Sequence, residues 1–213
     1  MDDISSVLYV CFLIPMLLSL LILESRARLV VGSILVGSTL CLIASFINTP
    51  LFRATGQNMR YYATTISPVI EEILKALPIL LYALFVSNDR RKLVQLSFAV
   101  GLGFAIMENM TMIAQSASGM TFLWALMRGF GAGLMHSICT VMVGMGISLV
   151  GKIRKLFYCG TVALLMLAIT YHSLYNTLVL SSAYKYFGIL LPLCTYIPIL
   201  VFQFRRRKQM RHE

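Results

Sequence analysis

The sequence predicts an all-α fold, a polytopic bundle of about seven helices that span a membrane. The composition is the first reason, because 59% of the residues are hydrophobic and only 12% are charged, whereas about a quarter of the residues of a soluble domain are charged. The second reason is that the apolar runs reach the roughly 20 residues that a spanning helix needs. The third is that most basic residues lie between those runs, where topology signals occur.

Seven apolar segments are long enough to cross a membrane. Each should be helical, because in lipid only helices and closed barrels satisfy every backbone group, and these runs lack the two-residue alternation of barrel strands. The first is expected to be a retained helix, since no basic stretch precedes it. The fifth is long and should tilt, protrude or begin as an interfacial turn. In order, the segments are 5–23, 29–47, 63–86, 93–115, 122–150, 156–180 and 187–204.

The third segment contains Pro68 and Pro78 and allows two interpretations. In one, Ser67 is an N-cap and Pro68 the first helical residue, so the helix starts there. In the other, the helix is continuous and kinked at both prolines. Glycines suggest close helix contacts in the next two segments. These glycines are Gly101 and Gly103 in the fourth segment, and Gly129 and Gly133 in the fifth.

The distribution of basic residues predicts the orientation. The positive-inside rule places the side with more Lys and Arg in the cytoplasm, so the N-terminus should be outside and the C-terminus cytoplasmic. The opposite side holds only Arg53, Arg60 and Lys185. The cytoplasmic side holds thirteen basic residues, namely Arg26, Arg28, Arg90, Arg91, Lys92, Lys152, Arg154, Lys155, Arg205, Arg206, Arg207, Lys208 and Arg211.

The chain is expected to form one integral membrane domain over residues 1–213, with the catalytic helices within 63–180. No linker, low-complexity run or convincing repeat divides it. The net charge of +10 does not indicate nucleic acid, because the basic clusters flank apolar runs and are better explained by anionic lipid. The sequence does not fix the oligomeric state.

Ionisable residues inside the apolar segments predict a functional site. A charged side chain in hydrocarbon is costly and normally faces a partner or a wet cavity. With the predicted topology, these residues lie at similar depths, so they could meet in the outer half of the membrane or near its centre. Arg128 could be a counter-ion or could extend outward, and the second is favoured. The candidates are Glu71, Glu72, Lys75, Glu108, Arg128, His136, His172 and Asn176.

Two chemistries fit such a set. A glutamate and a histidine could activate water for attack on an amide, with an amide side chain as oxyanion donor. Alternatively, the acids and histidines could hold a zinc ion that does so. The chain contains no HExxH motif, which argues against a zincin-type site. Intramembrane Glu and His chains also serve proton- or cation-coupled transporters, although no inverted repeat is present.

Four motifs resemble those of the PrsW-type intramembrane proteases. Glu71-Glu72-Ile73-Leu74-Lys75 is similar to the EExxK motif of that family, and Phe104 to Glu108 is similar to FxxxE. His136 and the His172–Asn176 pair are similar to the later histidine motifs. The wider clan includes the type II CAAX prenyl endopeptidases, whose EExxxR and FxxxH patterns are not met here.

The resemblance implies a glutamic-type intramembrane protease of the bacterial plasma membrane that needs no metal and cleaves a single-pass membrane protein, such as an anti-sigma factor. It implies that Glu71 activates water with help from His172, and that Asn176 stabilises the oxyanion. Glu72, Glu108 and His136 would orient water or substrate. Lys75, Phe104 and Arg128 would support them. A transporter, and a membrane chaperone or immunity factor that binds a partner helix, are the competing functions.

Overall fold

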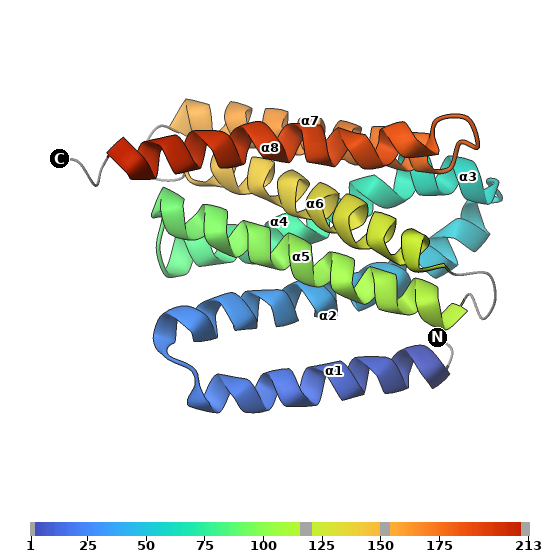
Figure 1. The fold of residues 1–213 in the computed structure, drawn as a ribbon, viewed down its shortest axis with the longest axis horizontal. Helices are drawn as coiled ribbons and strands as arrows, with labels where there is room; N and C mark the ends of the chain where they lie inside the picture. Colours follow the sequence, from blue (N-terminus) through green and yellow to red (C-terminus); the bar gives the residue numbers. More distant parts are fainter. Residues whose placement is uncertain (1–2, 116–120, 150–153, 210–213) are drawn as a thin grey trace.

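The computed structural model describes residues 3–115, 121–149 and 154–209. Within these ranges the secondary structure is entirely helical, and seven long helices follow one another along the chain (Figure 1). The predicted all-α bundle is therefore confirmed. The long helices are α1 (Asp3–Ile22), α2 (Ser25–Thr55), α4 (Ser67–Phe85), α5 (Arg90–Gln115), α6 (Phe122–Ile147), α7 (Arg154–Val179) and α8 (Lys185–Gln209).

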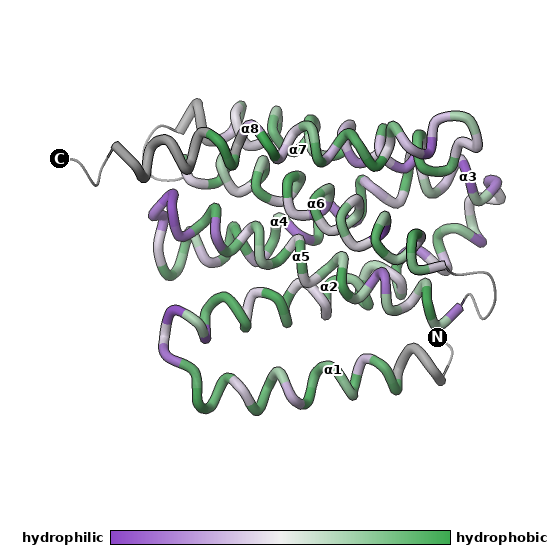
Figure 2. The backbone as a smooth tube through the Cα atoms, viewed as in Figure 1, coloured by the Kyte–Doolittle hydropathy of each residue, from purple (hydrophilic) through white to green (hydrophobic). Residues whose placement is uncertain are grey.

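Successive long helices run in opposite directions, so their connections alternate between the two ends of the bundle (Figure 1). The core forms mainly where α5 packs against α2 and α6, and where α6 packs against α7. Helix α1 lies at the edge and contacts α2 and α5. Hydrophobic residues cover most of the helix lengths, and hydrophilic residues gather towards the ends (Figure 2). Many large hydrophobic side chains are exposed, among them those of Leu21, Phe85 and Phe122, and such a surface suits contact with lipid.

The chain is a multi-pass membrane protein by the length and composition of its helices. In the described ranges, four helices are long and apolar enough to cross a membrane, namely α2, α5, α6 and the Tyr158–Val179 part of α7. Helix α1 is a shorter apolar helix by the same measure. Helix α4 carries three charged residues in its 19, which lowers its hydropathy although all three are buried. Spanning by α1, α4 and α8, and the orientation of the termini, stay predictions.

Several basic residues predicted to lie in loops belong to helices. Arg26 and Arg28 are in the first turn of α2, Arg90 starts α5, and the 205–208 cluster lies within α8. Arg and Lys are good helix formers whose long side chains extend towards water, so a helix can continue past the apolar segment. Helix α2 also runs beyond the predicted residue 47, and it ends before Gly56, whose φ of 61° is the left-handed conformation of a helix C-terminus.

The third predicted segment is a continuous helix. A short helix, α3 (Met59–Tyr61), leads into a π-helical turn, η1 (Tyr62–Ile66), and that turn leads into α4. Ser67 has helical φ and ψ of −55° and −46°, so it is not the N-cap of a new helix. Proline removes an amide donor and crowds the preceding turn, and a wider π-helical turn is one way to accommodate it. This gives a reason for a π-helical turn that ends at Ile66, two residues before Pro68.

Glycines bring the central helices into backbone contact. A Cβ atom added to Gly103 would collide with the backbone of Ile34 on α2, and one added to Gly101 would lie 2.6 Å from the Cα of Ser137 on α6. The predicted close contacts of α5 are thus confirmed. Within the chain, the predicted packing face of α6 makes no close contact at Gly129, where an added Cβ meets no atom within 4 Å. Gly133 approaches only a flexible leucine side chain.

We expect Gly103→Ala to destabilise the protein by about 1–3 kcal/mol, because the new methyl group must push α2 and α5 apart. Thermal unfolding in detergent or lipid nanodiscs measures the effect. Gly32→Ala on α2 is the matched control, since an added Cβ there meets nothing within 4 Å. Equal stability of the two variants would contradict the proposed contact between α2 and α5.

Candidate functional site

The structure brings most of the predicted site residues together in one buried cluster. They come from four helices, α4, α5, α6 and α7. Their direct contacts confirm the prediction that these residues lie at a similar depth along the bundle. The side chains of Glu72, Lys75 and His136 are fully buried, and that of His172 nearly so. The members in mutual contact are Glu71, Glu72, Lys75, Phe104, Glu108, Arg128, His136 and His172.

The Lys75 ammonium is at the centre of this cluster. Its Nζ donates to Glu72 Oε1 at 2.6 Å and to His136 Nδ1 at 3.0 Å. It also lies 4.8 Å from the centroid of the Phe104 ring, within range of a cation–π interaction. The spacing of three residues between Glu72 and Lys75 places them on one helix face. Lys75 therefore joins α4 to α6, and Phe104 covers it from α5.

The partners of the two histidines define different tautomers. His136 Nδ1 accepts from Lys75, so its proton is on Nε2, which donates to Glu108 Oε2 at 3.3 Å. His172 Nδ1 instead donates to Glu72 Oε1 at 2.7 Å. The lone pair of His172 is consequently on Nε2. The two rings pack edge to face, with their centroids 4.8 Å apart.

Glu71 has the only carboxylate oxygen in this cluster, among the described residues, that faces a free histidine nitrogen. Its Oε1 accepts a hydrogen bond from Ser67 Oγ at 2.6 Å. Its Oε2 is buried without a hydrogen-bond partner and lies 3.9 Å from His172 Nε2. Two acceptors face each other at that distance, so a donor or a cation that touches both would satisfy them. A water or a metal ion meets this requirement.

The cluster reaches the surface at Glu108. Its side chain is 26% exposed, more than those of the other acids in the cluster. Arg128 donates to Glu108 Oε2 at 2.6 Å, and its Nε donates to Asn109 Oδ1 at 2.9 Å. Arg128 is therefore a counter-ion, and the favoured prediction that it extends outward alone is wrong. Glu108 on α5 holds the Arg128 guanidinium against the bundle.

Residues outside the predicted set hold Glu71 in place. Asn48 on α2 donates from Nδ2 to Ser67 Oγ at 3.0 Å, and Tyr62 OH donates to Asn48 Oδ1 at 2.9 Å. Ser67 could have been found from its position one turn before Glu71. Asn48 could not, because only tertiary packing brings α2 to α4. The predicted residue Asn176 lies beside this group, where its Nδ2 donates to the Ala63 carbonyl at 2.8 Å.

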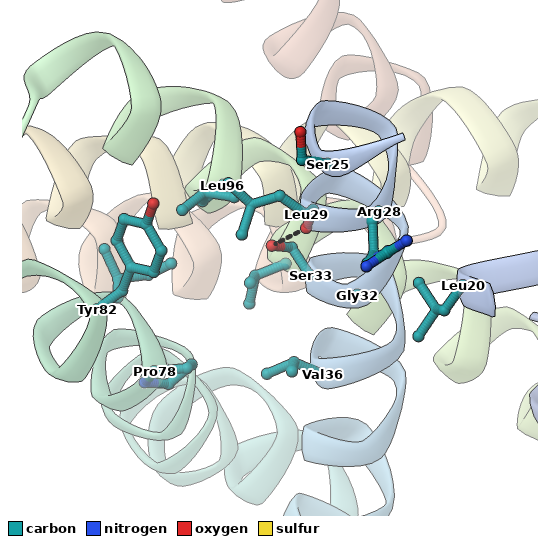
Figure 3. A pocket seen from close by; sticks show the side chains of 12 residues that line it. Leu20, Ser25, Arg28, Leu29, Gly32, Ser33, Val36, Pro78, Tyr82 and Leu96 are labelled. Carbon is teal, nitrogen blue, oxygen red and sulfur yellow. Dashed lines mark hydrogen bonds between the residues drawn. The ribbon is translucent and has the colours of Figure 1, made fainter. Parts of the chain in front are cut away.

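A separate groove lies between α2 and α4, with a volume of about 460 Å³ (Figure 3). Val36 and Pro78 lie on opposite sides of it (Figure 3). Its lining includes Ile79 and Val100, each four residues along its helix from a cluster member, Lys75 and Phe104 respectively. Both are almost fully buried. They separate the groove from the polar cluster by one helical turn, so the groove does not contain the cluster residues.

Comparison with protein families gives a match over residues 25–203 to the PrsW family of intramembrane metalloproteases. The match covers most of the chain and includes all four motifs. The chain belongs to the PrsW family. It is thus a membrane protease by family, which agrees with the resemblance of its motifs. Comparison with curated proteins and with solved structures found no match.

The description of the PrsW family implies a metal ion, and one group of residues has suitable donors. Glu71, His136 and His172 are buried, and one ligand atom of each lies within 4.8 Å of the others. Catalytic zinc sites commonly have three protein ligands of these types. Glu72, which accepts from His172, matches the carboxylate that usually orients a metal-bound histidine. The set therefore fits a metal in type and spacing.

One ligand of that set is not free. Both ring nitrogens of His136 have partners, Lys75 and Glu108, whereas Glu71 Oε2 and His172 Nε2 are open. A metal at this site of the PrsW protein would bind two ready ligands and would require His136 to release one partner. A water bound between Glu71 Oε2 and His172 Nε2 would need no such change.

We expect Lys75→Met to destabilise this PrsW protein by about 3–5 kcal/mol, because it leaves the Glu72 carboxylate buried without a cation. Adding Glu72→Gln removes that charge, so the double variant should recover most of the loss. Thermal unfolding of both variants in nanodiscs measures this. Lys185→Met on the exposed start of α8 is the control. A double variant no more stable than Lys75→Met would refute the ion pair.

Proposed function

We propose that this PrsW-family protein is an endopeptidase that hydrolyses a peptide bond of a single-pass membrane protein with a water molecule held between Glu71 and His172. The single observation that carries this proposal is the open pair of acceptors, Glu71 Oε2 and His172 Nε2, 3.9 Å apart in a buried site. One water can donate to both. Its lone pairs then point away from them, towards a substrate carbonyl.

The residues support a general-base mechanism. As the water oxygen bonds to the carbonyl carbon, its proton passes to Glu71 Oε2, and the same carboxyl group then delivers that proton to the leaving amine as the C–N bond breaks. His172 orients the water through Nε2. Glu72 holds the opposite nitrogen of that ring at 2.7 Å, which fixes the tautomer, as in other carboxylate–histidine pairs.

Glu108 and Arg128 form the exposed edge of the site and are placed to contact an approaching substrate. Lys75 and His136 connect this edge to Glu72 through hydrogen bonds of 3.3 Å or less. The connection makes the orientation of His172 sensitive to the state of Glu108. Because the site is buried inside the bundle, the water that reaches it is limited to the few molecules that polar groups hold.

Family membership and the predicted topology support a proposal for the location and the substrate. We propose that the protein lies in the bacterial plasma membrane and cleaves a single-pass substrate, of which an anti-sigma factor is one example, near the outer face. Membership of the PrsW family supports this. So does the position of Glu71 in the half of the bundle away from the basic clusters, if the predicted orientation holds.

The same site also has a metal-dependent alternative, favoured by the family description. Glu71, His136 and His172 would hold the ion. A bound divalent metal would polarise the water and the scissile carbonyl. In that case Glu72 would still orient His172, and Lys75 would still hold Glu72. We favour the metal-independent mechanism because His136 is already engaged on both sides.

We expect Glu71→Gln to lower cleavage by about 10²–10⁴-fold, because the amide cannot accept the proton from water. The measurement is single-turnover cleavage of a labelled single-pass substrate in liposomes. Glu24→Gln, an exposed glutamate before α2, is the control and should cleave normally. Retained activity in folded Glu71→Gln would remove Glu71 from the mechanism.

We expect a strong chelator to leave cleavage within about twofold of the untreated rate, because two open ligands are fewer than the three of catalytic zinc sites. Purified protein in liposomes is treated with chelator and assayed, and metal content is measured in parallel. Activity lost with chelator and restored by Zn²⁺ would instead establish the metal-dependent mechanism at Glu71, His136 and His172.

A further inference from the structure

One backbone carbonyl of the π-helical turn η1 cannot be satisfied within its own helix. The Ser67 amide donates to the Tyr62 carbonyl, five residues earlier, which is the hydrogen-bond spacing of a π-helix. In this register the carbonyl of Ala63 would pair with the amide of residue 68. Residue 68 is Pro68, which has no N–H. The carbonyl of Ala63 therefore needs a donor from elsewhere.

Asn176 supplies that donor. Helix α7 packs against η1, and Asn176 Nδ2 donates to the Ala63 carbonyl at 2.8 Å in a partly buried setting. Buried carbonyl groups are almost always paired, because leaving one unpaired costs the full desolvation of the group. The proline on α4 thus leaves the Ala63 carbonyl without a donor, and the asparagine on α7, far away in the sequence, supplies one.

This hydrogen bond lies one helical turn from His172 on α7 and two turns before Glu71 on the helix that continues into α4. Ala63 is four residues before Ser67, whose hydroxyl donates to Glu71. Asn176 is four residues after His172, on the same helix face. The bond therefore ties the helix that carries Glu71 to the helix that carries His172, and the facing atoms of those two side chains are 3.9 Å apart.

We propose that Asn176 is a positioning residue. It satisfies the Ala63 carbonyl that Pro68 leaves open, and so it fixes the spacing between Glu71 and His172. This role differs from the oxyanion donor that the motif resemblance implies, since it acts on the backbone of the protease and not on substrate. The effect on catalysis rests on the proposed function, whereas the effect on stability follows from the hydrogen bond alone.

The proposal predicts that Pro68→Ala suppresses the defect of Asn176→Ala, because alanine at position 68 restores an N–H for the Ala63 carbonyl. We expect Asn176→Ala alone to lower kcat about 10–100-fold, as a small misplacement of reacting groups does, with KM changed less than about twofold. Its Tm should fall by about 2–4 °C. The double variant should regain most of both losses.

The experiment measures kcat, KM and Tm for wild type, Asn176→Ala, Pro68→Ala and the double variant in nanodiscs. Asn176→Leu, which keeps the side-chain size but has no donor, replaces Asn176→Ala if that variant does not fold. Thr177→Ala is the control, since the Thr177 hydroxyl bonds only within α7, to Ser173. It should match wild type in all three quantities.

Recovery of both Tm and kcat in the double variant supports the positioning role. Recovery of Tm without kcat would overturn it, because Asn176 would then act on the substrate. A Tm loss that Pro68→Ala does not repair would overturn the hydrogen-bond argument itself. If wild type cleaves no substrate, the proposed function fails, and the Tm measurements still decide whether Asn176 and Pro68 are coupled.

Discussion

The buried ammonium of Lys75 is the interaction on which the rest of the site depends. It donates to Glu72 on its own helix and to His136 on α6, and both bonds are inside the bundle, where solvent does not screen them. A buried charge is tolerated only when it is paired and hydrogen-bonded. Glu72 in turn holds His172, and His136 holds Glu108. Lys75 therefore contacts Glu72, His136 and Phe104 directly. It orients His172 and Glu108 through one neighbour each.

The charges of the cluster explain why we propose Glu71 as the reactive acid. Glu72 is paired with Lys75 and Glu108 with Arg128. No Lys or Arg among the described residues forms an ion pair with Glu71. Its Oε2, like that of Glu72, is buried without a hydrogen bond. A buried carboxylate without a cationic partner is stabilised more than a paired one by a hydrogen bond from water or by contact with a cation. Pairing two of the three acids leaves the third available for chemistry, which is a common way to separate the roles of neighbouring carboxylates.

Much of the fold followed from the sequence. The seven long helices, their approximate bounds and the alternating connections could be predicted because a hydrophobic run of spanning length has few structural options in lipid. The errors were at the helix ends. Basic residues that marked the ends of apolar segments were assigned to loops, although the helices α2, α5 and α8 continue through them. Hydropathy locates the apolar part of a helix but carries no signal for where the backbone hydrogen bonds stop.

The sequence by itself determined that polar residues on four segments would share one site and which residue types it would contain, because an isolated charge in a membrane segment is too costly to leave unpaired. Only the tertiary structure decided which residues pair. It placed Arg128 on Glu108, gave the two histidines opposite tautomers, and brought Asn48 and Asn176 to the helix that carries Glu71. Partner choice depends on side-chain distances and on orphaned backbone groups such as the Ala63 carbonyl, and these exist only once the helices are packed.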